Sequence, residues 1–243
     1  MVHINVDSLS LRDSYEYLPG TKEETDGIVA NLIKHSIPYI YFTEKKGTEE
    51  SFKQLDGAKT KILHIATHGF YMTQKDAEVV RQTLQQTNRD GVTAYYEDKP
   101  MTRSGLLLAG CNKALNYEAV PKGQEDGILT AREISKLDLR ELDLVVLSAC
   151  QSGLGDITSG EGVFGLQRGF KNAGARTIIM SLWKVDDNAT QHLMTAFYNY
   201  YLDGKSKEQA FRMAQDELRK EYSKQQRKTK PDWAAFVIMD GIK

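Results

Sequence analysis

Three long apolar segments, separated by amphipathic ones, dominate the pattern of the chain. Apolar and β-branched residues run almost without interruption through 61–70 (KILHIATHGF), 143–150 (DLVVLSAC) and 175–183 (ARTIIMSLW). Such runs are typical of strands that are buried on both faces, as in parallel sheets. Helical patterns occupy 22–34, 161–174, 186–204 and 206–227. The alternation predicts an α/β fold of three layers, α-β-α, around a mostly parallel central sheet.

Shorter patterns predict the remaining elements. Strands are expected at 38–42 (PYIYF) and 233–239 (WAAFVIM), and a strand or a strand-like loop edge at 104–110 (SGLLLAG). Thr130 with Glu133 three residues later forms a capping box, which predicts a helix start. Gly174 is expected to end the helix before it. The polar segment 73–103 is predicted to be an exposed substrate-side or regulatory excursion.

Composition and charge narrow the class of protein. The 243 residues are 40% hydrophobic and 27% charged, as in a globular protein, and the net charge of −1 favours neither nucleic acid nor an anionic membrane surface. The N-terminus lacks the pattern of a signal peptide, and no apolar run reaches transmembrane length. Two cysteines form no disulfide framework. We therefore expect a cytoplasmic protein that binds no nucleic acid and no membrane.

Two strand ends carry residues suited to nucleophilic catalysis. His68 and Gly69 end the first long apolar segment, and Cys150 ends the second. Neighbouring parallel strands lie roughly 4.8 Å apart and point their carboxyl ends to one edge, where ligands bind in such sheets. An imidazole beside a thiol is the pairing that cysteine peptidases use. The glycines nearby leave backbone N–H groups accessible to a developing oxyanion.

Each of these residues has a structural alternative. Cysteine packs well as a small hydrophobe, which is how we interpret Cys111 and which is an alternative for Cys150. His64 is expected to be a hydrogen-bonded structural histidine, and no carboxylate cluster completes a metal site with it. The stretch 160–165 (GEGVFG) matches a dinucleotide-binding fingerprint, with Asp186 downstream, but it does not follow its strand directly. Dinucleotide binding is therefore a third hypothesis, and no cofactor or metal is predicted.

The order of longer motifs resembles that of the CHAT domain family. These motifs are HIATHGF, DGILTAREI, LVVLSACQSGLGD, GEGVFGLQRGFKNAGARTIIMSLWKVDDNAT, SKEQAFRMAQDELR and WAAFVIMDG. CHAT domains are caspase-like cysteine peptidase domains that are related to separase and commonly attached to tetratricopeptide repeats. The resemblance begins near residue 18, which leaves 1–17 as a lead-in segment and 18–243 as the domain. It implies the three-layer caspase–haemoglobinase fold.

The resemblance also implies roles for particular residues. The histidine of the family's T-H-G motif corresponds to His68, and the nucleophile of its S-A-C-x-[ST]-G motif corresponds to Cys150. The oxyanion would be held by the backbone N–H groups of Gly69 and Cys150. Related metacaspases carry an acidic residue two positions before the cysteine, where this chain has Ser148.

A different segment implies the substrate preference. SLWKVDD resembles the LWDVTD of separase, whose last aspartate lines the pocket for an arginine. That aspartate corresponds to Asp187, with Asp186 beside it. The alternative is that both aspartates are ordinary residues of a helix N-terminus. If Asp187 lines the pocket, cleavage after Arg or Lys is expected.

These observations together predict a bacterial-type cysteine endopeptidase that cleaves one or a few specific proteins through a His68–Cys150 dyad. A tetratricopeptide-repeat region or a partner protein is expected to regulate it. The alternative from another class is a catalytically silent CHAT module that serves as a protein-interaction platform.

Overall fold

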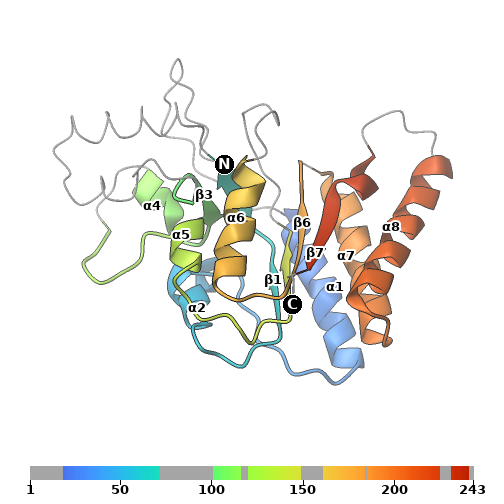
Figure 1. Ribbon diagram of the computed structural model, residues 1–243, viewed down its shortest axis with the longest axis horizontal. Helices are drawn as coiled ribbons and strands as arrows, with labels where there is room; N and C mark the ends of the chain where they lie inside the picture. Colours follow the sequence, from blue (N-terminus) through green and yellow to red (C-terminus); the bar gives the residue numbers. More distant parts are fainter. Residues whose placement is uncertain are drawn as a thin grey trace, which may run out of the picture.

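A four-stranded sheet forms the centre of the molecule (Figure 1). The computed structural model describes residues 19–71, 101–115, 120–148, 161–183, 185–224 and 231–240. The strands of this sheet lie in the order β1 (Ile62–Ile65), β5 (Leu144–Leu147), β6 (Thr177–Ser181), β7 (Phe236–Asp240). β1, β5 and β6 are parallel, and β7 is antiparallel to β6. The predicted mostly parallel central sheet is confirmed.

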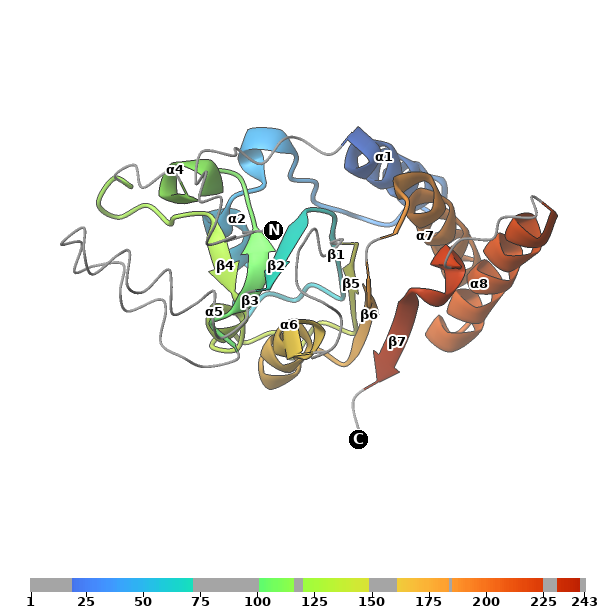
Figure 2. The same ribbon diagram turned by 90° about the horizontal axis from the view of Figure 1, so that it is seen from above.

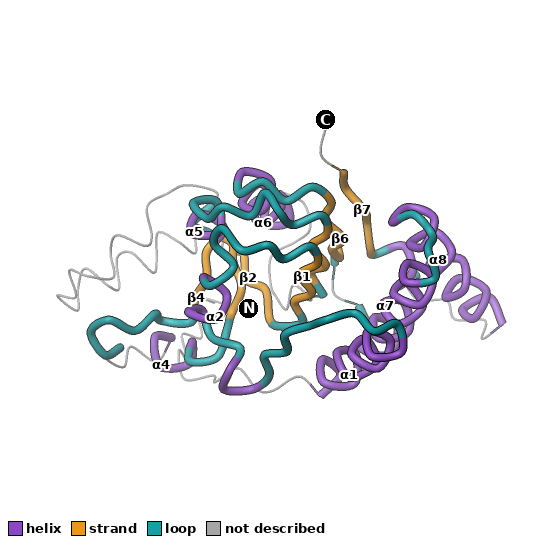
Figure 3. Tube along the Cα trace, turned by 90° about the horizontal axis from the view of Figure 1, so that it is seen from below, coloured by secondary structure: helices purple, strands orange, loops and turns teal. Residues whose placement is uncertain are grey.

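Helices cover both faces of this sheet (Figure 2). The helices of one face are α1 (Pro19–Lys34), α7 (Asp187–Leu202) and α8 (Lys207–Lys224), which lie together in Figure 3. Those of the other face are α2 (Glu49–Lys53), α5 (Ala131–Ile134) and α6 (Glu161–Asn172). Alternate residues of β5 serve the two layers: Leu144 and Val146 pack toward α7, whereas Val145 and Leu147 pack toward α6. The three-layer prediction is therefore confirmed.

A second, antiparallel sheet lies on the α6 side of the first (Figure 2). Its strands lie in the order β2 (His68–Tyr71), β3 (Ser104–Leu107), β4 (Ile128–Thr130), next to the short helix α4 (Cys111–Leu115). Two 3₁₀ turns, Glu44–Lys46 and Asp232–Ala234, complete the regular structure of the described residues.

The prediction of one continuous strand at 61–70 is wrong. β1 ends at Ile65, and three residues later the chain enters β2 of the other sheet. The hydroxyl of Thr67 donates a hydrogen bond of 2.5 Å to the carbonyl of Leu107, which holds the chain against β3 at this crossing. Hydrophobic periodicity cannot detect such a transfer, because both strands are apolar. As a result, His64 and His68 lie in different sheets.

The prediction of a strand at 38–42 is also wrong. These residues form no strand, and the side chain of Ile40 is 83% exposed. The phenol of Tyr41 instead contacts the hydroxyl of Thr25 in α1 at 2.8 Å. β-Branched and aromatic residues favour an extended backbone, but a strand also requires a partner to pair with.

Several local signals are confirmed. Thr130 and Glu133 form both hydrogen bonds of the capping box at the start of α5. Gly174, two residues after the end of α6, has φ +104°, a conformation that favours glycine. Pro19 occupies the first position of α1, where its missing N–H has no cost. No helix among the described residues is long and apolar enough to cross a membrane.

Candidate active site

The carboxyl ends of β1 and β5 lie side by side at one edge of the central sheet. Ile65 is paired with Leu147, and the N–H of Ser148 donates to the carbonyl of Ile65 at 2.8 Å, which extends the ladder by one residue. The T-H-G and S-A-C motifs therefore leave the sheet from the same edge. Cys150 lies outside the described residues, so its side chain and its N–H stay predictions.

Two residues of the T-H-G motif are paired with β3. His68 is the first residue of β2 and lies opposite Leu107, and Gly69 lies opposite Leu106. His68 is half-buried, whereas Gly69 is buried. The backbone of His68 and Gly69 is thus part of a strand, which is the kind of rigid support that a catalytic histidine requires.

Ser148 lies on the side of the sheet that faces α1. It continues the alternation of Leu144 and Val146, and it is only 5% exposed. Its hydroxyl donates a hydrogen bond of 2.8 Å to Oε2 of Glu24, from α1. The position that is acidic in metacaspases is therefore in contact with a carboxylate here, although the carboxylate comes from another element.

Glu24 itself was missed by the sequence analysis. It is 3% exposed, in the middle of an otherwise unremarkable polar stretch. The signal that identifies it is helical spacing: Gly20, Glu24 and Ile28 lie four residues apart and so share one face of α1. Because Ile28 is part of the buried core, the same face carries Glu24 inward.

His64, which is partly buried, completes this group of polar side chains. Its Nε2 lies 3.0 Å from Oε1 of Glu24, and its Nδ1 lies 3.2 Å from the hydroxyl of Tyr198, from α7. The rings of His64 and Tyr198 meet edge to face, with centroids 5.7 Å apart. Burial, with a smaller effect from the charge of Glu24, raises the pKa of Tyr198. The predicted hydrogen bonding of His64 is confirmed. We call Glu24, His64, Ser148 and Tyr198 the edge cluster.

The two aspartates that follow β6 differ in their contacts. Oδ1 of Asp186 accepts hydrogen bonds from the N–H groups of Asn188 at 3.0 Å and Ala189 at 3.3 Å, so this residue is the N-cap of α7. Asp187 is exposed and lies against Gly20: a Cβ added to Gly20 would be 2.8 Å from the Cβ of Asp187. A glycine is therefore required where the two helices begin together.

The similarity to known proteins assigns the chain to a family. Residues 7–241 match the CHAT domain family. The chain is a CHAT domain. Its three-layer architecture is accordingly that of the caspase-like, peptidase-related fold.

Among curated proteins, the CHAT domain is similar to tetratricopeptide repeat protein 28 of Mus musculus, with 40% identity over 78 residues. The protein of the same name from Homo sapiens is 38% identical over 77 residues. Each match covers 32% of this chain and 3% of the relative.

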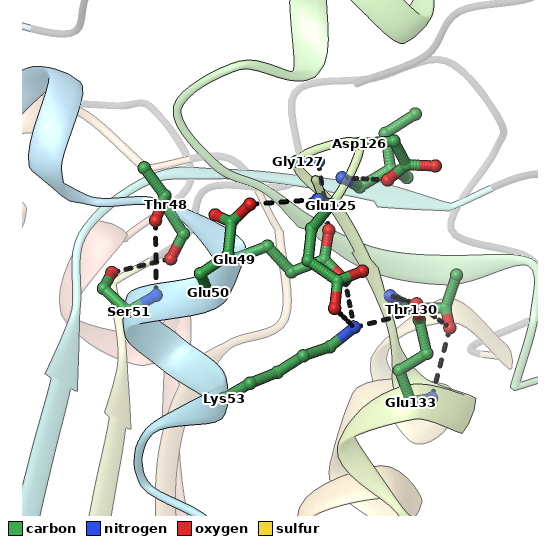
Figure 4. A network of polar contacts seen from close by, with 11 residues as sticks. Thr48, Glu49, Glu50, Ser51, Lys53, Glu125, Asp126, Gly127, Thr130 and Glu133 are labelled. Carbon is green, nitrogen blue, oxygen red and sulfur yellow. Dashed lines mark hydrogen bonds and ion pairs between the residues drawn. The ribbon is translucent and has the colours of Figure 1, made fainter. Parts of the chain in front are cut away.

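A second carboxylate group of the CHAT domain surrounds a lysine (Figure 4). Nζ of Lys53 lies 2.7 Å from Glu49, 2.8 Å from Glu125 and 3.5 Å from Glu133. The other oxygen of Glu49 accepts the N–H of Gly127 at 3.0 Å. Burial raises the pKa of Glu49 to about 7, and the surrounding carboxylates raise the pKa of Lys53 against the opposing effect of its burial. We call these four charged residues the lysine cluster.

The lysine cluster is also the only group of the described residues whose carboxylates lie close enough together for a metal ion, within 4.8 Å of one another. The ammonium of Lys53 already lies among them and supplies the positive charge. We therefore assign it no metal.

Cys111 and the glycine-rich stretch add no chemistry to the described part of the CHAT domain. Cys111 is buried, and burial raises its pKa to about 11, so the thiol is protonated at neutral pH and acts as a small hydrophobe. Residues 161–165 of that stretch are the first residues of α6; residue 160 and the side chains of residues 161–163 lie outside the description. Asp186, which the dinucleotide hypothesis needs for a ribose, caps α7 instead.

Proposed function

We propose that this CHAT domain is a cysteine endopeptidase that hydrolyses peptide bonds in specific proteins, with Cys150 as nucleophile and His68 as general base and acid. One observation carries the proposal: β1 and β5 are parallel neighbours that end together at Ile65 and Leu147. The histidine motif follows one of these ends and the cysteine motif follows the other. Parallel sheets of this kind bind ligands at that edge.

The proposed reaction follows from the chemistry of the two side chains. The imidazole of His68 accepts the thiol proton of Cys150, and the thiolate attacks the carbonyl carbon of the scissile bond. The N–H groups of Gly69 and Cys150 would donate to the oxyanion of the tetrahedral intermediate. His68 then gives its proton to the leaving amine, and water hydrolyses the acyl-enzyme. The proposed reaction uses no cofactor and no metal.

We further propose that Asp187 favours substrates with Arg or Lys before the cleaved bond. Asp187 is exposed and lies just beyond β6, at the same edge of the sheet as Ser148. Asp186 is the weaker candidate, because its carboxylate already accepts two backbone hydrogen bonds of α7. Ser148 is a weaker candidate as well, since it is buried against Glu24.

The partners proposed are a protein substrate and a tetratricopeptide-repeat region that regulates cleavage. The similarity to tetratricopeptide repeat protein 28 supports such a context, because that protein carries the repeats in its name.

The nucleophile is tested with a peptide-based cysteine electrophile that carries Arg at its first position. We expect the wild type to be labelled stoichiometrically and Cys150→Ala not to be labelled. His68→Ala should slow labelling by at least about a hundredfold, the usual contribution of a general base. Equal labelling of wild type and Cys150→Ala, or none with a panel of electrophiles and an added repeat region, would contradict the proposal.

The preference is tested by comparing substrates. Asp187→Ala should lower kcat/KM for cleavage after Arg by about 10- to 100-fold and leave cleavage after a neutral residue unchanged, as loss of one charged contact predicts. Asp216→Ala, which removes an exposed aspartate from α8, is the control. Equal losses for both substrates would mean that Asp187 acts only at the helix N-terminus.

The second candidate is a catalytically silent interaction module. The exposure of the apolar side chains of Ile33, Ile40 and Phe42 is the observation that favours it, because interaction sites are where proteins expose large apolar patches. The same labelling experiment decides between the two, since a silent module has no reactive Cys150.

A further inference from the structure

We infer that Glu24 is a positioning residue for the proposed peptidase reaction: its carboxylate joins the ends of β1 and β5 and so sets the relative position of His68 and Cys150. The inference rests on the proposed function. Glu24 is on α1, far in sequence from both motifs, yet its two oxygens contact one residue that precedes each of them.

The contacts define a bridge across the edge of the sheet. Oε2 of Glu24 accepts the hydroxyl of Ser148 at 2.8 Å, two residues before Cys150. Oε1 lies 3.0 Å from Nε2 of His64, four residues before His68; the two atoms are close enough for an ion pair, but their geometry is not that of a hydrogen bond. Ser148 and His64 lie on the same side of their strands, the side that faces α1 and α7. One buried carboxylate thus links both strand ends.

Stability alone does not account for this bridge. β1 and β5 are already joined by a four-residue parallel register and by the Ser148 to Ile65 hydrogen bond. A carboxylate that is 3% exposed has lost its hydration, and a well-packed apolar side chain at such a site is often equally stabilising. Costly polar groups concentrate where function requires exact geometry. The edge cluster lies at such a place.

The neighbours of Glu24 hold the carboxylate in one orientation. The titratable side chains facing it are His64 from β1 and Tyr198 from α7, and Tyr198 in turn contacts Nδ1 of His64. Gly20, one turn before Glu24 in α1, lies in close contact with Asp187, and this contact limits how α1 can be placed on the sheet. Because Glu24 contacts Ser148 and His64, a shift of α1 would move both strand ends.

The test measures the alkylation of Cys150 by iodoacetamide as a function of pH. Cys111 is the only other cysteine in the sequence. It is buried and its pKa is raised, so we expect it not to react and not to obscure the reaction of Cys150. A thiol paired with an imidazolium ionises well below about 8.5, the ordinary value for cysteine. In Glu24→Gln we expect the apparent pKa of this reaction to rise toward about 8.5, and the rate at pH 6 to fall about tenfold.

The direction of the shift separates positioning from simple electrostatics. Removing a negative charge near a thiol stabilises the thiolate and lowers its pKa. Loosening the dyad has the opposite effect, because the thiolate loses its imidazolium partner. A raised pKa therefore supports positioning, and an unchanged or lowered pKa in folded Glu24→Gln overturns it.

Matched variants control for charge and for stability. Glu23→Gln removes the neighbouring, exposed carboxylate of the same helix and should leave the profile unchanged. Glu49→Gln removes an equally buried carboxylate from the lysine cluster and should alter stability but not the profile. If either control shifts the profile as Glu24→Gln does, the inference fails.

Two further outcomes are distinguishable. If Glu24→Gln does not fold, Ser148→Ala removes one half of the bridge with a smaller perturbation, and it should shift the profile in the same direction; no shift overturns the inference. If the wild type itself alkylates with the pKa of an ordinary thiol, the proposed function fails and the inference fails with it. If the wild type alkylates with a lowered pKa and the Glu24 and Ser148 variants show the same pKa, the proposed function stands and the inference fails.

Discussion

The edge cluster and the lysine cluster each bury a glutamate almost completely, but they bury it against different partners. Glu49 in the lysine cluster is 1% exposed and lies against the ammonium of Lys53 and a backbone N–H. Glu24 in the edge cluster is 3% exposed and lies against an imidazole and a hydroxyl. No ammonium or guanidinium contact of Glu24 is found among the described residues.

The comparison of Glu49 with Glu24 shows that the burial of a carboxylate does not by itself reveal its role. The elements that the carboxylate connects do. Glu49 fastens α2 to the loop before β4, at Gly127, and its charge is compensated locally (Figure 4). Glu24 fastens α1 to the two strand ends from which the candidate catalytic motifs follow. We therefore expect the first cluster to determine stability and the second to determine reactivity.

Replacing Lys53 with methionine should produce the largest loss of stability. The variant leaves the buried Glu49 without its ammonium. Breaking a fully buried pair costs about 3–5 kcal/mol in the free energy of unfolding, and we expect a loss near the lower end because Lys53 is 27% exposed. Urea unfolding at pH 8 measures it. The loss should be smaller at pH 5, where Glu49 is protonated; an equal loss at both pH values would contradict this account.

Glu49→Gln should change how stability depends on pH. The pKa of Glu49 is raised to about 7 in the folded state, so the folded protein holds a proton that the unfolded chain has released above its ordinary pKa of 4.5. This carboxyl therefore lowers stability as pH rises through that window, by on the order of 2 kcal/mol between pH 5 and pH 8. The variant should gain by this amount relative to wild type at pH 8. If the stabilities of wild type and Glu49→Gln change with pH in the same way, Glu49 does not titrate between pH 5 and pH 8.

Gly20→Ala should affect both stability and the edge cluster. The added methyl would lie 2.8 Å from the Cβ of Asp187, so α1 must move or strain by about 1–3 kcal/mol. Because Glu24 is one turn away on the same face, the alkylation profile of Cys150 should shift in the direction expected for Glu24→Gln. The double variant Gly20→Ala/Asp187→Gly should regain part of the stability that Gly20→Ala loses.

Tyr198→Phe should have the smallest effect. It removes only the hydroxyl that contacts Nδ1 of His64 at 3.2 Å, which costs about 1 kcal/mol by thermal unfolding. The alkylation profile should move less than in Glu24→Gln, since both oxygens of Glu24 keep their partners. A larger shift than in Glu24→Gln would make Tyr198, rather than Glu24, the centre of the cluster.

Most of the fold could be predicted because its signals are local. The capping box at Thr130, the glycine at 174 and the apolar run at 144–147 each depend on neighbouring residues alone. The errors at 61–70 and 38–42 have one cause: whether an extended segment becomes a strand, and in which sheet, depends on distant partners such as Leu107.

The candidate site divides in the same way. By itself the sequence determined the family, the three-layer fold, and the choice of His68 and Cys150 as candidates, because these follow from motif order and from the apolar strands that precede each motif. Only the tertiary structure brought Glu24 to Ser148 and His64, and Asp187 to Gly20. These contacts join residues 40 to 167 positions apart, and they form only when helices α1 and α7 pack on the sheet. Packing, which no local pattern records, decided what surrounds the candidate dyad.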